Sequence, residues 1–357
     1  MTRRTFLGAF GAAAQPKPPN ILVIMPDQWR GMDLGAAGNR QVRTPHLDRL
    51  AAEGVHFTGA VANTPVCTPA RSILLTGKYA HETQTAVNDV PLPDGEVTIA
   101  ETLAARGYYT GFIGKWHLEG GKRLPGFVPP GPRRQGFEFW AANICSHAYF
   151  DQQYFRDGPE PIRMPGYEVF TWTDLALEFL DNARRKAKPY CLYVEYGPPH
   201  DPYLAPPGYE TMYDPESIEL RKNWRAGSAR NGTRKDIAGY YAAIACLDRE
   251  IGRLLDRVDD NTIVVFTSDH GDMLGSQGTF LKRKPWEESV RVPGILRWPA
   301  GFRGGWKSDA PFSHVDVVPT LLGLAGAGRK LSGFDYSNLL RGRGRRTPEY
   351  AHLAIHT

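Results

Sequence analysis

The chain has 357 residues, of which 41% are hydrophobic and 11% aromatic, enough to bury one large core with or without a small appendage. Its formal net charge is only +5, and part of that excess lies near the two ends, within 3–17 and 341–346. No basic stripe with interleaved aromatic residues is present, so the composition argues against a nucleic-acid-binding protein.

The N-terminal segment, residues 1–15, is typical of an export signal. The pair Arg3 and Arg4 precedes a short apolar run and a group of alanines that ends at Ala14. A twin-arginine signal with a small-residue cleavage region has this layout, so we expect export to the periplasm. The alternative is a tail that happens to contain two arginines. No later run is long and apolar enough to span a membrane.

Apolar runs and helix-like segments alternate along the rest of the chain. The run NILVIM at 20–25 is typical of a strand buried on both faces. A helix is expected after it, with Thr44 as its cap, Pro45 in its first position and Gly54 as its stop. Further helices are predicted within 98–107, 171–186 and 234–258, and further strands within 109–114, 190–196, 261–268 and 294–298. This alternation predicts an α/β fold with a mostly parallel sheet sandwiched by helices.

Two of the predicted strands end in acidic groups. The first is followed by Asp27 and Gln28, and the strand within 261–268 is followed by Asp269 and His270. An aspartate after a strand is often only a turn former. However, ligands of open α/β sheets bind at the carboxyl ends of the strands, where the two acidic ends can meet. Oxygen-rich ligation with one nitrogen suits Ca²⁺, Mg²⁺ or Mn²⁺ better than a closed zinc site.

Basic groups follow other predicted strands. If the stretch after 109–114 is extended, Lys115 and His117 lie on one face and form an anion-binding and proton-transfer pair. The simpler alternative is a solvated lysine and a capping histidine. His200 stands between prolines after another apolar strand, and Lys282 lies in a basic loop. Taken alone, those two are most simply structural and solvated residues.

The segment 67–77, CTPARSILLTG, places a cysteine at the expected start of a helix. Pro69 belongs in a first helical turn, so Cys67 lies where unpaired N–H groups and the helix dipole favour negative charge. Arg71 lies on the same face and can hold the oxygens of an anion. The arrangement indicates a nucleophile facing an oxyanion. A cysteine protease would leave the carboxylates and lysines without a role.

Together these motifs resemble the formylglycine-dependent sulfatases of the alkaline phosphatase superfamily. The segment 67–77 matches the family's first signature, with Ala70 where serine is frequent, and 107–117 matches the second. The stretches PNILVIMPDQ and SDHGDMLG match its two metal-binding motifs. The resemblance implies an alkaline-phosphatase-like fold, with a catalytic domain at 19–326.

The resemblance also implies a chemistry and a set of site residues. Cys67 would be converted to formylglycine by a formylglycine-generating enzyme, and the hydrated aldehyde would attack a sulfate monoester. The resemblance implies one divalent cation, and its ligands would be Asp27, Gln28, Cys67, Asp269 and His270. Ca²⁺ is the expected ion, with Mg²⁺ or Mn²⁺ as alternatives. The resemblance implies that Arg71 stabilises the hydrate and that Lys115 and Lys282 bind the sulfate oxygens. It implies that His117 takes the proton that triggers sulfate release and that His200 protonates or positions the leaving oxygen. Asn88 would contact the substrate.

Some features leave alternatives open. Family members usually continue into a small C-terminal antiparallel sheet, and we expect 327–357 to be only a remnant of it. A non-catalytic remnant is therefore one alternative to a sulfuric ester hydrolase. Another is a phosphonate monoester or phosphodiester hydrolase, which shares the Asp–Gln and Asp–His pattern but tends to have uncharged hydroxyl residues at the positions of Lys115 and His117.

The substrate is open at this stage, although a carbohydrate sulfate is one candidate. The segment 119–168 is rich in glycine, proline and arginine, and its aromatic residues favour an ordered insertion over a linker. Two arginines could bind a carboxylate of such a sugar, and three aromatic side chains could pack against its ring: Arg133, Arg134, Trp140, Tyr149 and Trp172. A packed insertion with surface arginines explains the same residues.

Overall fold

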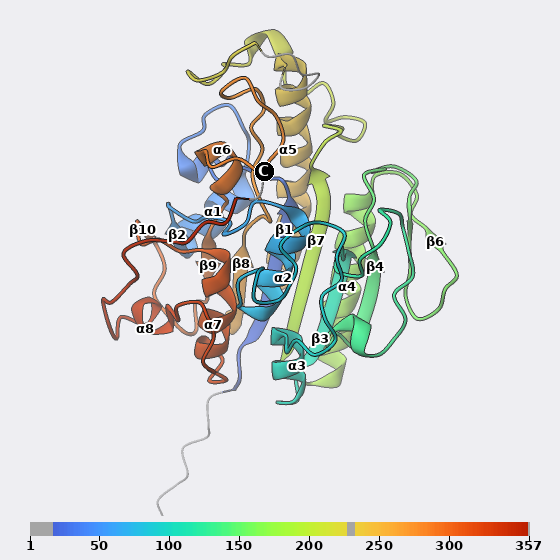
Figure 1. The fold of residues 1–357 in the computed structure, drawn as a ribbon, viewed down its shortest axis with the longest axis vertical. Helices are drawn as coiled ribbons and strands as arrows, with labels where there is room; N and C mark the ends of the chain where they lie inside the picture. The colour runs from blue at the N-terminus through green and yellow to red at the C-terminus, as the bar shows by residue number, and fades with distance from the viewer. Residues whose placement is uncertain (1–16, 227–232, 356–357) are drawn as a thin grey trace, which may run out of the picture.

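A computed structural model describes residues 17–226 and 233–355, so the export signal predicted for 1–15 lies outside the described residues. One large sheet runs through the described part of the chain, in the order β10-β2-β9-β8-β1-β7-β3-β4 (Figure 1). Its strands are β1 (Asn20–Asp27), β2 (Val55–Phe57), β3 (Tyr109–Lys115), β4 (Phe139–Asn143), β7 (Tyr190–Pro199), β8 (Thr262–Phe266), β9 (Ile295–Arg297) and β10 (Trp306–Ser308). All neighbouring pairs are parallel except those that β9 makes with β8 and β2.

Helices cover both faces of this sheet, which confirms the predicted α/β architecture. The helices are α1 (Pro45–Glu53), α2 (Cys67–Thr76), α3 (Ile99–Ala104), α4 (Glu168–Lys186), α5 (Arg234–Leu255), α6 (Glu287–Val290), α7 (His314–Leu324) and α8 (Ser337–Leu340). Alternate side chains of β1 enter two separate cores. Leu22 and Ile24 pack with α1, α4 and α5, whereas Ile21 and Val23 pack with α2, α3 and α7. The strand is therefore hydrophobic throughout because both of its faces are covered.

Local capping partly follows the expectation from the sequence. Helix α1 begins at Pro45 and is followed by Gly54, as predicted. Thr44 occupies the N-cap position as predicted, but its side chain accepts no hydrogen bond from the helix, so the capping interaction itself is not formed. Its hydroxyl donates to Asp48 Oδ1 at 3.0 Å and accepts from the N–H of Gly35 at 2.9 Å, so it joins the helix to the preceding loop instead.

The segment 119–168 is an ordered part of the fold. It contributes β4 and a two-stranded ribbon of β5 (Gln153–Tyr154) and β6 (Ile162–Arg163). Trp140, Tyr149 and Trp172 are at most 2% exposed, so these aromatic faces pack in the core and do not meet a ligand. Arg134 is buried and donates to the carbonyl of Val128 at 3.0 Å. For these residues the packed-insertion interpretation is correct.

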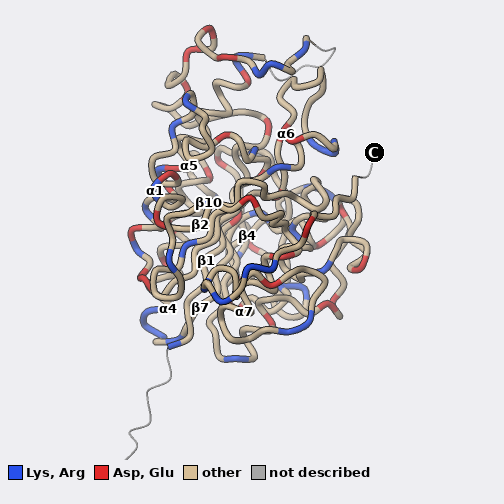
Figure 2. Tube along the Cα trace, turned by 90° about the vertical axis from the view of Figure 1, so that its left-hand side faces the viewer, with Lys and Arg blue, Asp and Glu red and all other residues tan. Residues whose placement is uncertain are grey.

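The surface carries charges of both signs. Lysines and arginines are interspersed with aspartates and glutamates along the chain in the view of Figure 2. Among the described helices, none combines the length and the hydropathy that crossing a membrane requires. The segment that follows α7 contains α8 and then runs back toward α2, where Asn63 Nδ2 donates to the carbonyl of His352 at 2.8 Å.

Candidate active site

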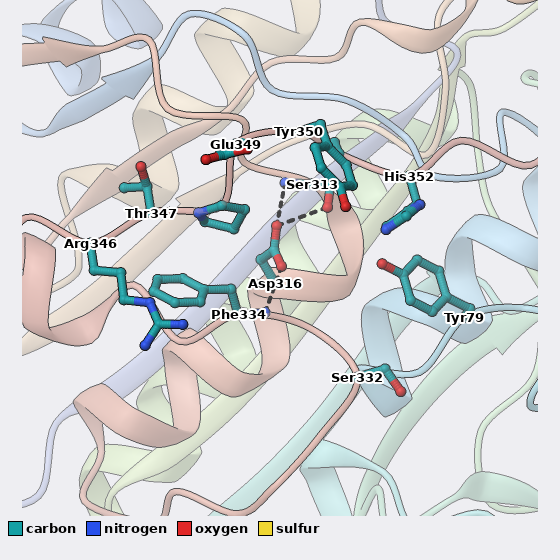
Figure 3. A pocket seen from close by; sticks show the side chains of 12 residues that line it. Tyr79, Ser313, Asp316, Ser332, Phe334, Arg346, Thr347, Glu349, Tyr350 and His352 are labelled. Carbon is teal, nitrogen blue, oxygen red and sulfur yellow. Dashed lines mark hydrogen bonds between the residues drawn. The ribbon is translucent and has the colours of Figure 1, made fainter.

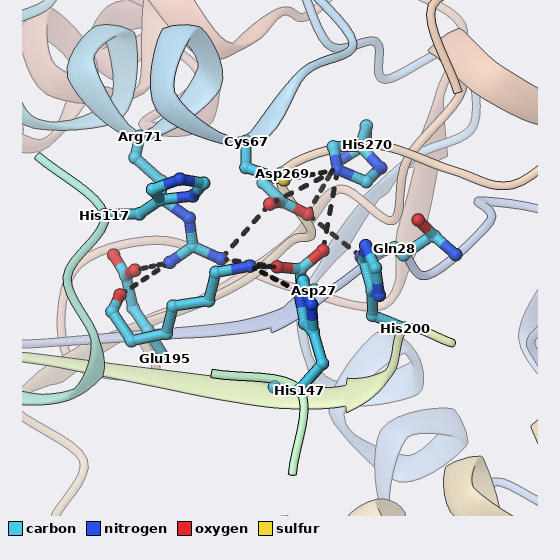
Figure 4. Close-up of polar contacts among 12 residues, drawn as sticks. Asp27, Gln28, Cys67, Arg71, His117, His147, Glu195, His200, Asp269 and His270 are labelled. Atoms are coloured by element: carbon cyan, nitrogen blue, oxygen red, sulfur yellow. Dashed lines mark hydrogen bonds and ion pairs between the residues drawn. The ribbon is translucent and has the colours of Figure 1, made fainter. Parts of the chain in front are cut away.

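The predicted ligands and the cysteine converge at one edge of the sheet, where β1 and β8 end and α2 begins (Figure 4). One ligand atom from each of Asp27, Cys67, Asp269 and His270 lies within 4.8 Å of the others, and all four side chains are buried. Cys67 Sγ lies 3.3 Å from His270 Nε2. The β1–β7 register shifts between Pro26 and Asp27, which places Asp27 beside the end of β7.

These donors fit a divalent cation. Asp27 Oδ1 is buried with no hydrogen-bond partner among the described residues, whereas its Oδ2 accepts from Arg71 and Lys115. The Nδ1–H of His270 donates to the carbonyl of Gly271 at 2.9 Å, which leaves its Nε2 lone pair free to bind a metal. Two carboxylates and one imidazole that face a common space are suitable ligands for Ca²⁺, Mg²⁺ or Mn²⁺.

The two carboxylates of this cluster oppose each other electrostatically. Burial alone would raise the pKa of Asp27, but the charge of Lys115, helped by other cations, holds that pKa well below its ordinary value. Burial, followed by the negative charge of Asp27, raises the pKa of Asp269. A cation between them would relieve this repulsion, which is a second reason why the cluster suits a metal.

Gln28 lies beside the cluster in a left-handed conformation, with φ of 68°. Its backbone N–H donates to Asp269 Oδ1 at 3.0 Å, and its side-chain Nε2 donates to Asp272 Oδ2 at 2.6 Å. Its Oε1 accepts from Lys282 Nζ at 2.7 Å. The amide therefore joins the metal-ligand candidates to the basic loop.

Arg71 is a fully buried centre of the charge network. Its Nη2 donates to Asp27 Oδ2 and Asp269 Oδ2, both at 3.1 Å. Its Nη1 donates to the carbonyl of Lys115 at 2.8 Å and to the carboxylate of Glu195. Burial raises the pKa of Glu195 to about 8, against the opposing charge of Arg71. The guanidinium thus fixes α2 to β1, β3 and β7 directly beneath Cys67.

His117 does not follow the predicted strand alternation. Strand β3 ends at Lys115, and His117 has a φ of 51°, so the stretch is not extended there. The side chain is nevertheless buried at the site, where its Nε2–H donates to Asp89 Oδ1 at 2.9 Å. Burial disfavours the imidazolium, but interactions with the thiols of Cys145 and Cys67 outweigh it and raise the pKa of His117 to about 9.

Asn88 lies at the start of α2. Its Oδ1 accepts a hydrogen bond from the backbone N–H of Thr68 at 3.0 Å. That N–H belongs to the first turn of the helix and has no intrahelical partner, so Asn88 caps the helix from another segment. Its role as a substrate contact stays a prediction.

Three residues of this site escaped the sequence reasoning, namely Glu195, Asp89 and His147. Glu195 left a detectable signal, because it is the one acidic residue in the otherwise apolar run at 190–196. Asp89 and His147 left none, because each lies in an irregular loop and meets its partner only in the folded protein.

A separate cavity of about 500 Å³ lies between α7 and the segment 346–352 (Figure 3). Asp316 lies in its wall, but its carboxylate already accepts from Ser313 and from the N–H of Phe334 at 2.7 Å. None of the cation-cluster or lysine residues lines this cavity. The hydrogen bonds between Ser313 and Asp316 form a capping box at the start of α7.

A doubly covered, mostly parallel sheet with a buried acidic cluster at its carboxyl edge, facing a cysteine at a helix start, defines a metal-binding member of the alkaline phosphatase superfamily. The chain belongs to the sulfatase family, whose model, named Sulfatase, matches residues 19–327.

Individual relatives agree with this assignment. An ulvan-active sulfatase of Formosa agariphila is 42% identical over 321 residues, which are 87% of this chain and 62% of that protein. The chain thus spans just under two thirds of that relative's length. An N-acetylglucosamine-6-O-sulfatase of Bacteroides thetaiotaomicron is 28% identical, covering 87% of this chain and 68% of that one. A structure of the YidJ protein of Bacteroides fragilis superposes with a TM-score of 0.87 at 30% identity, covering 95% and 81% of the two chains.

Proposed function

We propose that the protein is a sulfuric ester hydrolase that cleaves a sulfate monoester. The observation that carries this proposal is the position of Cys67. It is buried at the start of α2, in contact with His270 and beside two carboxylates. A sulfate monoester has one negative charge shared by three non-bridging oxygens. Fixed positive groups around those oxygens stabilise both the bound ester and the charge that develops during transfer.

Cys67, after conversion to formylglycine, supplies the nucleophile. One hydroxyl of the hydrated aldehyde attacks sulfur as the S–O bond to the alcohol breaks, and the proton that this hydroxyl loses passes to the leaving oxygen, so that the alcohol departs neutral. The second hydroxyl then gives its proton to His117, the bond between carbon and the sulfate oxygen breaks, and sulfate leaves with restoration of the aldehyde. Water hydrates the aldehyde for the next cycle. A serine could not release its own adduct in this way without an attacking water.

The other side chains position the sulfate ester and neutralise its negative charge. Arg71 stabilises the hydrate, and Lys115 and Lys282 hold sulfate oxygens. His200 helps to position the leaving oxygen, because its Nδ1–H already donates to the carbonyl of Asp201 and its Nε2 accepts from Lys282. Asn88 is a weaker candidate for a substrate contact. The cation would be held by Asp27, Gln28, Asp269, His270 and the modified Cys67. When bound, it supplies Lewis-acid stabilisation of the negative charge on the transferring group. We propose Ca²⁺, with Mg²⁺ or Mn²⁺ as the alternatives.

A carbohydrate sulfate is the substrate class that we propose. The support is the similarity to an ulvan-active sulfatase and to an N-acetylglucosamine-6-O-sulfatase. We also propose that a formylglycine-generating enzyme modifies Cys67 and that the segment 1–15 directs export to the periplasm through the twin-arginine route.

A phosphonate monoester or phosphodiester hydrolase is the second candidate. The pairs Asp27–Gln28 and Asp269–His270 favour it, because that group shares them. Lys115 and His117 oppose it, because that group tends to have uncharged hydroxyl residues at these two positions. A non-catalytic remnant is the third candidate, although such a protein has no need for a full set of catalytic side chains.

The test uses protein produced together with a formylglycine-generating enzyme and loaded with Ca²⁺. Mass spectrometry of the peptide that contains Cys67 establishes the modification, and turnover of an aryl sulfate is compared with turnover of an aryl phosphonate. We expect sulfate hydrolysis that Cys67→Ala abolishes. A preference for the phosphonate would overturn the proposal, and a thiol left unmodified would favour the remnant. A panel of sulfated sugars then tests the substrate class.

A further inference from the structure

Two lysines occupy matched environments in the site. Lys115 Nζ donates to Asp27 Oδ2 at 2.5 Å and to His147 Nε2 at 3.4 Å. Lys282 Nζ donates to Gln28 Oε1 at 2.7 Å and to His200 Nε2 at 2.5 Å. An ammonium group has three N–H donors. Among the described residues, these contacts therefore leave one N–H of each lysine available to a further acceptor.

The two imidazoles that contact these lysines are stacked on each other. The ring centroids of His147 and His200 lie 4.2 Å apart, with an angle of only 4° between the ring planes. Both side chains lie beside Asp27 in the view of Figure 4. The Nδ1–H of His200 donates to the carbonyl of Asp201 at 2.8 Å, so its Nε2 is an acceptor toward Lys282. The stacking holds His147, which lies in an irregular loop after β4, in a fixed orientation.

We propose that His147 is a positioning residue for the sulfate-binding site. Its Nε2 holds the ammonium group of Lys115 so that the remaining N–H faces a sulfate oxygen, as His200 does for Lys282. The sulfate is then bound by Lys115 and Lys282, and the stacked imidazoles of His147 and His200 set the orientations of the two ammonium groups. This inference rests on the proposed function, because it requires a sulfate ester as substrate.

The charge state of His147 agrees with a role as acceptor. Burial, and then the neighbouring charge of Lys115, lowers the pKa of His147 to about 3. The ring is therefore neutral near neutral pH, and its Nε2 keeps the lone pair that the ammonium needs. A neutral ring also adds no charge of its own, so its effect on the sulfate passes through Lys115.

The experiment separates the acceptor from the ring. His147→Gln keeps an acceptor in place of Nε2 but loses the ring, His147→Phe keeps a ring that can stack but loses the acceptor, and His147→Ala loses both. The control is His81→Phe, since His81 is exposed and stacks on Tyr79 at 5.7 Å, away from the site. Inorganic sulfate is titrated into each Ca²⁺-loaded protein by calorimetry, and hydrolysis is measured with two aryl sulfates whose phenols differ in acidity. Thermal denaturation checks the folding of each variant.

We expect the Kd for sulfate to rise about 10- to 100-fold in the Phe and Ala variants, as follows from loss of one hydrogen bond to a charged group, and to change by less than about threefold in the Gln variant. The value of kcat/KM of the Phe variant should fall by the same factor for both aryl sulfates, because Lys115 acts on the sulfate and not on the phenol. The His81 control should match the wild type.

Two results would overturn the proposal. One is a Phe variant that binds sulfate as the wild type does, or better than the Gln variant, because the ring alone would then suffice. The other is a loss that grows with the basicity of the phenol, because His147 would then act on the leaving group through His200. A wild-type protein that hydrolyses no sulfate ester contradicts the proposed function instead, and the sulfate titration still decides the role of His147.

Discussion

At the scale of single residues, Arg71 contacts more buried carboxyl groups than any other side chain described above. Its guanidinium contacts Asp27, Glu195 and Asp269, and it is 1% exposed. Removal of one partner from a buried ion pair leaves charge without compensation, which costs far more than the pair contributes over an apolar replacement. Arg71 is therefore required for the fold as well as for the proposed hydrate.

Arg71→Met should lower the free energy of unfolding by about 3–5 kcal/mol, because it leaves buried carboxylates without their shared cation. Urea denaturation in the presence of a chelator measures this effect without a metal contribution. The matched control is Arg253→Met, since Arg253 is 41% exposed and pairs with Asp174 and Glu250, an arrangement expected to contribute about 1 kcal/mol or less. Equal losses in the two variants would contradict this explanation.

The pKa of His117 should fall when Cys67 is changed, although Cys145, the first of the groups that raise it, stays in place. An imidazole with a pKa of about 9 is already protonated at neutral pH and cannot accept the proton that the proposed cycle gives it. Because the Cys67 thiol is among the groups that raise this pKa, Cys67→Ala should lower it, as should formylglycine. NMR titration of the imidazole measures the change, with Cys246→Ala on α5 as the control. An unchanged pKa in the Cys67 variant would remove His117 from the proposed role.

The same shift has a consequence for stability in the thiol form. A folded-state pKa above the ordinary value of 6.5 means that His117 stabilises the fold fully at lower pH. The stabilisation is lost as the pH rises from 6.5 through about 9. Urea denaturation between those values should therefore show a decline that is smaller in His117→Gln, where only other groups such as Glu195 still contribute to it.

At the scale of elements, helices and strands whose signals lie within their own residues were predictable from the sequence. The apolar runs of β1, β7 and β8, and the proline and glycine that bound α1, needed no distant partner. Strand β4 was not predicted, because Phe139–Asn143 follows a glycine- and proline-rich stretch and becomes a strand by pairing with β3. Likewise the structure brings together four motif residues that the sequence singled out, Asp27, Cys67, Asp269 and His270. Glu195 and His147 were missed, because their partners lie 124 and 32 positions away.

Helix α2 offers a test of the Asn88 cap. Asn88→Ala should lower the free energy of unfolding by about 0.5–2 kcal/mol, because the N–H of Thr68 loses its acceptor. Asn88→Asp keeps the acceptor oxygen and should stay close to the wild type in stability. If its amide also contacts substrate, Asn88→Asp should raise KM for a sulfate ester through charge repulsion. An alanine variant as stable as the wild type would show that the hydrogen bond from Thr68 to Asn88 does not contribute to stability.

At the scale of the whole molecule, the cation cluster joins β1, β8 and α2 across the sheet. A ligand that binds only the folded state stabilises it, by about 2.7 kcal/mol at 100 times its Kd. A chelator should therefore lower Tm, and Ca²⁺ should raise it as its concentration increases. Asp269→Asn should show little of this dependence, and a Tm indifferent to metal in the wild type would contradict the site.

Cation binding should also release protons. The raised pKa of Asp269 means that the metal-free protein holds a proton to higher pH than an ordinary aspartate does. The cation must displace that proton, so affinity should fall as pH falls. Calorimetry in two buffers of different ionisation enthalpy measures the release. Identical heats in both buffers would contradict it.

The burial of Cys67 limits when a modifying enzyme can reach this residue during folding of the nascent chain. The sulfur-bearing residue is 2% exposed, and every residue of α2 is buried with it. If Cys67 is converted to formylglycine as proposed, the maturation enzyme must enclose this residue in its own catalytic pocket, which it cannot do once α2 has packed against the sheet. Under that proposal the conversion has to precede the packing of α2, and chains that fold before it would stay inactive. Slow folding, usually a handicap for a protein, would here raise the yield of active molecules.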